Sequence, residues 1–245
     1  MTVCMFPGQG TQTKGMGKDL FGRFAELTRT ASDILGYSIE ELCLEDPRKE
    51  LNNTRFTQPA LYVVNALIWR QWQAAAAQLP AFVMGHSLGE FNALEAAGVI
   101  GFEDGLRLVQ KRGALMAEAP PGAMAAVLGM AEQQVRDTLA TNGLDAIDIA
   151  NLNAPTQCIL SGLRDDIMGA ASVFEGDGVH YLPLNTSGAF HSRYMADARE
   201  AFEAFLANVS FDDFAIPVIS NVHGEPYADD AVAATLGAQI TSPVQ

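Results

Sequence analysis

The sequence predicts an α/β fold in which a large α/β-hydrolase-like domain is interrupted by a small ferredoxin-like α+β subdomain. Three observations lead to this prediction. Short apolar runs of strand length alternate with longer segments of helical period along most of the chain. A Gly-x-Ser-x-Gly motif follows one such run and opens a helix. Between residues 121 and 185 the order changes to strand, helix, strand, strand, helix, strand.

The N-terminal part of the chain predicts one strand and two helices. A strand is expected over residues 2–6, and a glycine-rich loop follows it. Helices are expected over residues 19–35 and 57–78, where apolar side chains recur at helical spacing. The apolar stripe of the second helix is interpreted as buried core, and it consists of Leu61, Val64, Ile68 and Trp72.

The glycine-rich loop over residues 7–17 does not predict a nucleotide site. Thr13 stands where a dinucleotide-binding motif needs its third glycine, and Met16 stands where a phosphate loop needs its lysine. Backbone N–H groups in such a loop can still bind a different anion.

The Gly-x-Ser-x-Gly motif is formed by Gly85, Ser87 and Gly89. The apolar run 81–84 before it has the length of a buried strand, and the residues after it are typical of a helix. Strand, sharp turn and helix are the context in which this motif exposes a nucleophilic serine. The alternative is a glycine-rich turn whose serine only caps the helix, and the flanking elements favour the nucleophile.

Domain boundaries follow from the change of pattern in the middle of the chain. The small subdomain is expected over residues 121–185, and the large domain over residues 1–120 and 186–245. A cleft between two such units is a common place for a ligand. From residue 102 onward the expected elements are helix 102–119, strand 123–129, helix 132–141, strands 146–151 and 157–161, helix 165–175, strand 179–184, helix 192–208, strand 216–220 and a helix ending near residue 240.

Composition and charge disfavour several classes of function. Apolar residues make up 49% of the 245 residues and charged residues 18%, which is typical of a folded globular protein. The net charge of −14 disfavours nucleic acid and anionic membrane surfaces as partners. The three cysteines are odd in number and far apart, so a reducing cytoplasm is expected. The N-terminus predicts neither a signal peptide nor a membrane span.

A nucleophilic Ser87 needs a base that removes its proton, and the chain has four histidines. His86 precedes the serine and is expected to point away from it. His191 lies where the chain re-enters the large domain, so it is the candidate base, with a buried structural histidine as an equal alternative. No histidine has metal-ligand spacing with another histidine or a cysteine, so no metal site is expected.

Two further features would serve acyl transfer at Ser87. The backbone N–H of Leu88 and a second N–H from the loop around Gln9 could stabilise an oxyanion. Arg112 lies on a predicted helix and could hold a carboxylate with two hydrogen bonds. Its spacing alone, however, favours a solvated helix face.

Four separated motifs together resemble the malonyl-CoA:acyl carrier protein acyltransferases. They are Gly-Gln-Gly at 8–10, Gly-His-Ser-Leu-Gly-Glu at 85–90, Lys-Arg-Gly-Ala-Leu-Met at 111–116 and Gly-Ala-Phe-His at 188–191. Their order and spacing extend the resemblance over essentially the whole chain. The segments 56–67 and 148–153 are similar more particularly to the discrete acyltransferases that serve trans-acyltransferase polyketide synthases.

The resemblance implies roles for the residues around the motif serine. Ser87 would be the acylated nucleophile and His191 its base. The main-chain amides of Gln9 and Leu88 would form the oxyanion hole.

The resemblance also implies how the acyl group is selected. Arg112 would bind the free carboxylate of a malonyl group, which reverses the interpretation from spacing alone. Gln239 would orient His191 through its main-chain carbonyl, and Phe190 would favour malonyl over methylmalonyl. Gly188 departs from the histidine that malonyl-selective modular enzymes often have, which weakens the inference on selectivity slightly.

The implied reaction moves a malonyl group from malonyl-CoA to the phosphopantetheine thiol of an acyl carrier protein, through acyl-Ser87. No bound cofactor is expected, and a cytoplasmic monomer is expected to serve polyketide synthesis in trans. Carrier proteins are usually acidic, so docking through a local basic or apolar patch is expected. The start at Met1 fits a free-standing protein or an N-terminal domain. Family members continue beyond the position of Gln245, so a truncated chain is one expectation.

Four other functions compete with this one. An acyl hydrolase that clears stalled acyl groups from carrier proteins, or a transferase for an uncharged acyl group, would have no use for Arg112. A non-catalytic carrier-binding module would not need Ser87, His191 and Arg112 together. An α/β-hydrolase esterase would need an acidic residue between the serine and the histidine, and the inserted subdomain occupies that interval. The candidates there are Asp145, Asp148, Asp165 and Asp166.

Overall fold

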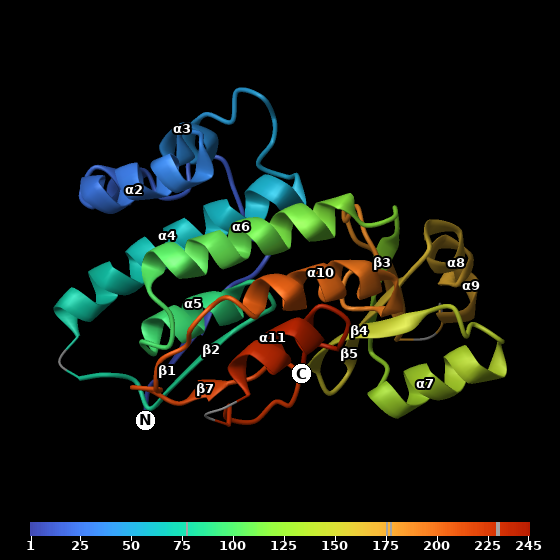
Figure 1. Ribbon diagram of the computed structural model, residues 1–245. Coiled ribbons are helices and arrows are strands. Elements are labelled where there is room, and N and C mark those ends of the chain that lie inside the picture. The colour runs from blue at the N-terminus through green and yellow to red at the C-terminus, as the bar shows by residue number, and fades with distance from the viewer. Residues whose placement is uncertain (77, 175, 177, 229–230) are drawn as a thin grey trace.

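A parallel sheet of three strands lies at the centre of the larger part of the molecule. The computed structural model describes the whole chain except residues 77, 175, 177 and 229–230 (Figure 1). The strands are β1 (Val3–Phe6), β2 (Phe82–Gly85) and β7 (Val218–Ile219), in the order β1-β2-β7. Both strand pairs are parallel, so the carboxyl ends of β1 and β2 lie side by side. The loop after β1 and the Gly-x-Ser-x-Gly turn therefore meet at one edge of the sheet.

Helices cover both faces of this sheet (Figure 1). The two longest, α4 and α6, pack along each other. The helices in this part of the molecule are α1 (Lys18–Phe21), α2 (Ala25–Leu35), α3 (Ile39–Leu44), α4 (Thr54–Ala75), α5 (Gly89–Ala96), α6 (Phe102–Glu118), α10 (Ala196–Leu206) and α11 (Val232–Gln239), with a 3₁₀ turn η1 over Arg193–Met195. Helices α2 and α3 pack on α6 and α4.

Helix α4 differs from the sequence prediction at both ends and in one buried position. It begins at Thr54, because the Asn53 side chain caps it by accepting a hydrogen bond from the Arg55 N–H. It ends at Ala75, because Ala76 already has an extended backbone with ψ of 135°, so the predicted end at residue 78 is wrong. Ile68 was predicted to be core and is 50% exposed, because this side of α4 is open to solvent in its C-terminal half.

A second sheet lies at one end of the molecule (Figure 1, right). Its strands pair antiparallel in the order β4-β5-β3-β6. Their sequence order, with helices after β3 and β5, agrees with the predicted alternation of elements. The single helix expected over 165–175 is two short helices that meet at Ala170, and its last residue, Glu175, lies outside the described residues. The elements are β3 (Ala123–Leu128), α7 (Glu132–Thr141), β4 (Asp148–Ala154), β5 (Gln157–Gly162), α8 (Arg164–Gly169), α9 (Ala171–Phe174) and β6 (His180–Pro183).

The two faces of the second sheet belong to different cores, because side chains alternate along a strand. On β3, Ala125 and Val127 pack with the helices α7 to α9, in a core of their own. Met124 and Ala126, on the opposite face, join the core of the large sheet. The second sheet thus turns an apolar face toward the edge where β1 and β2 end.

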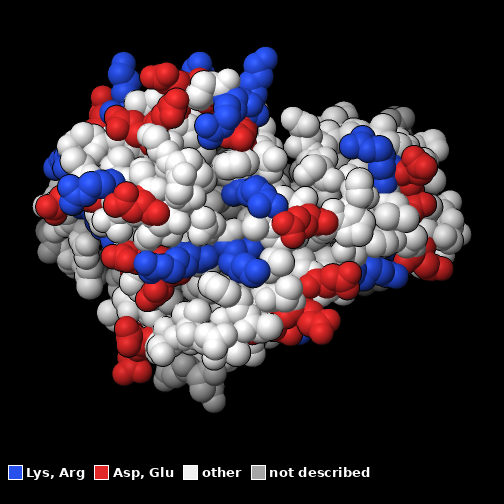
Figure 2. Space-filling view, turned by 45° about the horizontal axis from the view of Figure 1, so that its top comes forward, with Lys and Arg blue, Asp and Glu red and all other residues white. Residues whose placement is uncertain are grey.

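Acidic and basic side chains are interspersed on the face drawn in Figure 2, so the excess of acidic residues does not form one continuous field there. Within the described residues, no helix is both long enough and apolar enough to cross a membrane.

Candidate active site

Ser87 lies on the tight turn between β2 and α5, in a left-handed backbone conformation with φ of 52°. Both flanking glycines are required by close backbone contacts. A Cβ atom on Gly85 would lie 1.9 Å from the carbonyl carbon of Gly89, and one on Gly89 would lie 2.2 Å from the carbonyl oxygen of Phe6. A non-glycine residue with positive φ is uncommon and concentrates at functional sites. The turn thus fixes the serine between the carboxyl end of β2 and the start of α5.

The Ser87 hydroxyl contacts two side chains that come from distant parts of the chain. Its Oγ lies 2.8 Å from Nε2 of His191 and 3.0 Å from Nη2 of Arg112. Nδ1 of His191 lies 2.8 Å from the main-chain carbonyl oxygen of Gln239. A carbonyl oxygen only accepts, so Nδ1 carries the ring proton and Nε2 is free to accept one from the serine.

His191 is 4% exposed and also has positive φ, 55°. Burial, and then the charge of Arg112, lower the pKa of His191 to about 3, although the hydrogen bond to the Gln239 carbonyl acts in the opposite direction. The imidazole is therefore neutral at neutral pH, which is the form that accepts a proton.

Arg112 is 1% exposed, so the interpretation from its spacing, a solvated helix face, is wrong. The helix carrying it packs against α4, and this side of α6 faces the serine. Nη1 donates to Oε1 of Gln58 at 2.7 Å, and Nη2 donates to Oε1 of Gln239 at 2.8 Å. Burial lowers the pKa of Arg112 to about 10, so it stays cationic at neutral pH. Its Nε is buried without a partner among the described residues.

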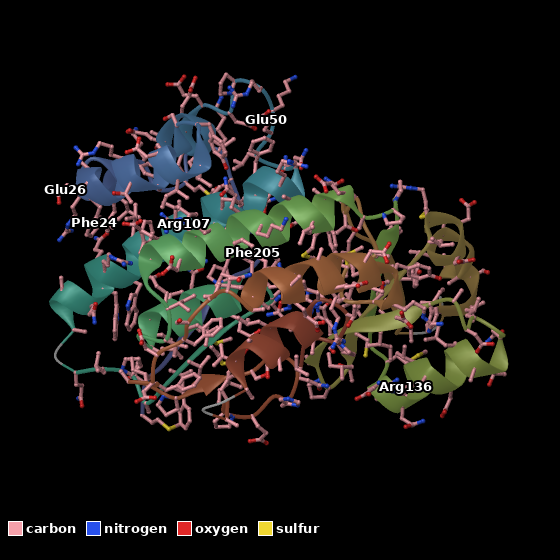
Figure 3. All side chains as sticks on the ribbon, viewed as in Figure 1. Phe24, Glu26, Glu50, Arg107, Arg136 and Phe205 are labelled. Carbon is pink, nitrogen blue, oxygen red and sulfur yellow. The ribbon has the colours of Figure 1, made fainter. Side chains whose placement is uncertain are left out.

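A cavity of about 210 Å³ opens beside the serine. Two larger hollows have volumes of about 630 and 950 Å³, and neither Ser87 nor Arg112 lines them. The wall of the larger one includes Arg107 and Phe205, which are labelled in Figure 3 on α6 and α10. The cavity beside the serine is lined by Gln9, Gln58, His86, Ser87, Leu88, Arg112, Met116, Met124, Asn151, Asn153, Ile159, Leu184, Thr186, Phe190 and His191.

Gln9 and Leu88 both line the cavity beside the serine. Leu88 is the residue before the first residue of α5 and is fully buried. The loop that carries Gln9 lies against the serine turn, since a Cβ atom on Gly8 would meet the His86 carbonyl oxygen at 2.3 Å. The Gln9 side chain donates to the hydroxyl of Thr54 at 3.1 Å. The two residues thus reach the cavity from different segments, Leu88 directly after the serine and Gln9 from the neighbouring loop.

Phe190 packs where the cavity meets the loop before His191, and it is 6% exposed. A Cβ atom on Gly188 would lie 2.7 Å from the ring of Phe190. A larger residue at position 188 would therefore compete with the present position of the ring.

His86 lies beside Ser87 in sequence, and its ring contacts the second sheet. It lines the same cavity as Ser87, and its Nε2 lies 3.0 Å from Oδ1 of Asn153 and 3.2 Å from Nδ2 of Asn151. Both asparagines belong to β4, so His86 connects the serine turn to the second sheet.

Sequence reasoning missed Gln58, Glu90 and Asn221. Asn221 clamps the serine turn, because its Oδ1 accepts from the Ser87 N–H and its Nδ2 donates to the Gly85 carbonyl oxygen, both at 2.6 Å. Glu90 was visible as the acidic end of the Gly-His-Ser-Leu-Gly-Glu motif. The spacing of Gln58 and Asn221 carries no comparable signal.

An esterase-type triad is not formed. The Nδ1 atom of His191 contacts the Gln239 carbonyl, whereas Asp148, one of the four acidic candidates, pairs with Arg193 at 2.5 Å. Within the described residues, no three His, Cys, Asp or Glu side chains lie close enough together to hold a metal ion.

Known proteins match this chain over nearly its whole length, in sequence and in structure. The chain is 52% identical to the polyketide biosynthesis malonyl CoA-acyl carrier protein transacylase BaeC of Bacillus velezensis, over 100% of this chain and 86% of BaeC. A crystal structure of a malonyl CoA-acyl carrier protein transacylase from Burkholderia pseudomallei matches with a TM-score of 0.96 at 52% identity, over 99% of this chain and 83% of that one. A complex of a type II polyketide synthase acyl-carrier protein with its malonyl-transacylase matches with a TM-score of 0.92 at 33% identity, over 99% and 82%.

The family follows from the extent of these matches. The acyl transferase domain model matches residues 3–244, a range that includes both sheets and every residue of the cavity. With a serine turn, a neutral histidine and a buried arginine meeting inside that range, the chain belongs to the acyl transferase domain family.

Proposed function

We propose that this chain transfers a malonyl group from malonyl-CoA to the phosphopantetheine thiol of an acyl carrier protein. One observation carries the proposal: Ser87 Oγ lies within hydrogen-bond distance of both a neutral histidine and a buried cation. The first contact supplies a base for a nucleophile, and the second places a carboxylate-binding group where the acyl chain would lie. The names of BaeC and of the matching structures point to the same reaction.

The reaction has two halves that use the same residues. His191 accepts the Ser87 proton as Oγ attacks the thioester carbonyl, and the resulting imidazolium returns the proton to the leaving thiolate of coenzyme A. The thiol of the carrier arm then attacks acyl-Ser87, again with His191 as base. The Gln239 carbonyl keeps Nδ1 protonated, so that Nε2 faces the serine in both halves.

The main-chain N–H groups of Gln9 and Leu88 would stabilise the tetrahedral oxyanion. Leu88 directly follows the nucleophile at the start of α5, where N–H groups have no partner within the helix. Loss of one such donor typically costs about 3 kcal/mol of transition-state stabilisation.

Arg112 would bind the free carboxylate of the acyl group. Its Nη atoms are already held by Gln58 and Gln239, so the guanidinium is fixed before the substrate arrives. Phe190 would restrict the space beside the acyl carbon and so disfavour a methyl branch.

Partners and architecture complete the proposal. The chain would use malonyl-CoA and an acyl carrier protein, need no bound cofactor, and act as a cytoplasmic monomer that serves polyketide synthesis in trans. Residues 121–185 would form a ferredoxin-like subdomain, and residues 1–120 with 186–245 the α/β-hydrolase-like domain. The antiparallel order β4-β5-β3-β6 supports the first assignment.

The experiment that tests the function follows the malonyl group through both half-reactions, from malonyl-CoA to Ser87 and from Ser87 to the carrier. The protein is loaded with radiolabelled malonyl-CoA, freed of excess substrate, and mixed with a holo acyl carrier protein. We expect the label to move from the protein to the carrier, and no label to be retained by Ser87→Ala. Release as free malonate, with none on the carrier, would contradict the transferase and favour the acyl hydrolase.

A further inference from the structure

Glu90 is a carboxyl group with no exposed surface, and the proposed reaction does not use it. It lies in the first turn of α5, three residues after the nucleophile. Its Oε1 accepts hydrogen bonds from the Asn221 N–H at 2.9 Å and from the Tyr227 hydroxyl at 2.7 Å. Its Oε2 accepts one from Nε2 of Gln239. Burying a carboxyl group costs free energy unless the group is hydrogen-bonded. The three donors offset this cost and hold the Glu90 carboxyl group in one position.

Two of these donors also hold the groups at the serine. Asn221 fixes the turn by its contacts to Ser87 and Gly85. Gln239 donates from its Nε2 to the Ser87 carbonyl oxygen at 3.1 Å, in addition to its main-chain contact with His191. Glu90 therefore anchors both residues that clamp the nucleophile and its base.

The side-chain amide of Gln239 stands between Glu90 and Arg112. Its Nε2 faces the carboxyl group, and its Oε1 accepts from Nη2 of Arg112 at 2.8 Å. The carboxyl group fixes this orientation, because only an acceptor suits the guanidinium and only a donor suits the carboxylate. Burial raises the pKa of Glu90 to about 7, against the opposing effects of its hydrogen bonds and of the charge on Arg112.

The interposed amide has a consequence for binding. A direct bidentate pair between Arg112 and Glu90 would occupy the fork that a substrate carboxylate needs. With Gln239 in between, Arg112 forms no salt bridge in the described part of the chain. The carboxyl group thus restrains the arginine without competing for it.

We propose that Glu90 is a positioning residue for selection of the acyl group: it fixes the Gln239 amide, which aims Arg112 at the carboxylate of the acyl chain. The inference rests on the proposed role of Arg112. Glu90 touches no substrate, and its effect passes through Gln239.

Replacement of Glu90 by glutamine separates positioning from general stability. In Glu90→Gln the amide oxygen keeps the contacts to the Asn221 N–H and the Tyr227 hydroxyl only if the N–H₂ group faces Nε2 of Gln239. Two donors then face each other, and the Gln239 amide loses its fixed direction. We expect kcat/KM for loading malonyl-CoA to fall by about tenfold or more, the usual loss for a hydrogen bond to a charged group, and kcat/KM for acetyl-CoA to fall far less.

The matched control is Glu95→Gln. Glu95 is a second buried glutamate on α5, its side chain is 4% exposed, and it pairs with Arg70 at 2.6 Å away from the cavity. We expect this variant to lower the melting temperature and to leave the ratio of malonyl to acetyl loading unchanged. A purely structural role of Glu90 would give the same pattern in both variants.

Two further variants, Gln239→Met and Arg112→Met, are measured with the same two substrates. Gln239→Met removes the side-chain amide that links Glu90 to Arg112, and it keeps Glu90 and the main-chain carbonyl that contacts His191. We expect it to lower malonyl loading more than acetyl loading. This variant tests the inference even if Glu90→Gln does not fold. Equal losses for both substrates, or a higher malonyl preference in Glu90→Gln, would overturn the inference. Arg112→Met tests the function separately: if it leaves the ratio unchanged, the proposed role of Arg112 fails, whatever Glu90 does.

Discussion

Arg112 carries its charge in the same cavity as His191, and this affects the imidazole. Burial and the nearby guanidinium both disfavour a second proton on the ring, and together they lower its pKa to about 3. In the unfolded chain the ring titrates near 6.5, so the unfolded state takes up a proton as the pH falls below about 6.5. This group's contribution to the free energy of unfolding therefore decreases between about pH 6.5 and pH 3.

We predict that His191 stays neutral from about pH 8 to about pH 5, whereas an ordinary histidine would titrate in this range. The measurement is an NMR pH titration of the histidine rings, in which His191→Gln identifies the resonance. Arg112→Met removes the nearby charge and is expected to shift the His191 midpoint upward. A midpoint near 6.5 that Arg112→Met leaves unmoved would contradict this account.

For single residues, the chemical role was easier to predict from the sequence than the position of the side chain in the fold. Ser87 was predicted from its motif and flanks, and the structure brings it together with His191 and Arg112. The burial of Arg112 was not predictable from its own helix, because it depends on which side of α6 faces α4. The contacts of His86 were not predictable from its place in the motif either, because its partners, Asn151 and Asn153, lie in another sheet.

The turn between β2 and α5 is the element on which the site depends. Gly85 and Gly89 lie where this turn meets the strand β1, with no room for a Cβ atom on either. The clash partners are backbone atoms, which cannot move aside as a flexible side chain could. The fixed turn sets both the direction of Ser87 and the position of Leu88.

We predict that Gly85→Ala lowers the free energy of unfolding by about 3 kcal/mol or more, because the turn must deform. The control is Gly169→Ala at the end of α8, where nothing lies within 4 Å of the added Cβ atom. It is expected to change stability by less than about 1 kcal/mol, in the stabilising direction. Urea unfolding followed by circular dichroism measures both variants, and equal effects would show that the turn tolerates a side chain.

Elements with a strong local signal were predicted, and their ends were set by caps and tertiary contacts. The helix expected over 19–35 is interrupted between α1 and α2, near Gly22. Helix α3 was not predicted, although Ser38 caps it by accepting from the Glu41 N–H, and this Ser-x-x-Glu spacing is visible in the sequence. The strand expected over 216–220 pairs only over Val218–Ile219.

At the scale of the whole molecule, the cavity exists because separate parts of the chain converge on the end of β2. Ser87 follows β2, Arg112 comes from α6, and Gln239 ends α11. The second sheet closes the cavity with the apolar face that carries Met124 and Ile159. The resemblance of the motifs implied which residues would meet. The contacts that hold them, above all those of Glu90, depend on the complete fold.

The most direct test of the central claim measures which acyl group reaches Ser87 and what selects it. An equimolar mixture of malonyl-CoA and acetyl-CoA is offered briefly to the wild type, Ser87→Ala and Arg112→Met, and the adducts are identified by intact mass and peptide mapping. We predict a malonyl adduct on Ser87 of the wild type, none on Ser87→Ala, and a shift toward acetyl in Arg112→Met. A malonyl preference that survives the loss of Arg112, or an adduct on another residue, would contradict the account.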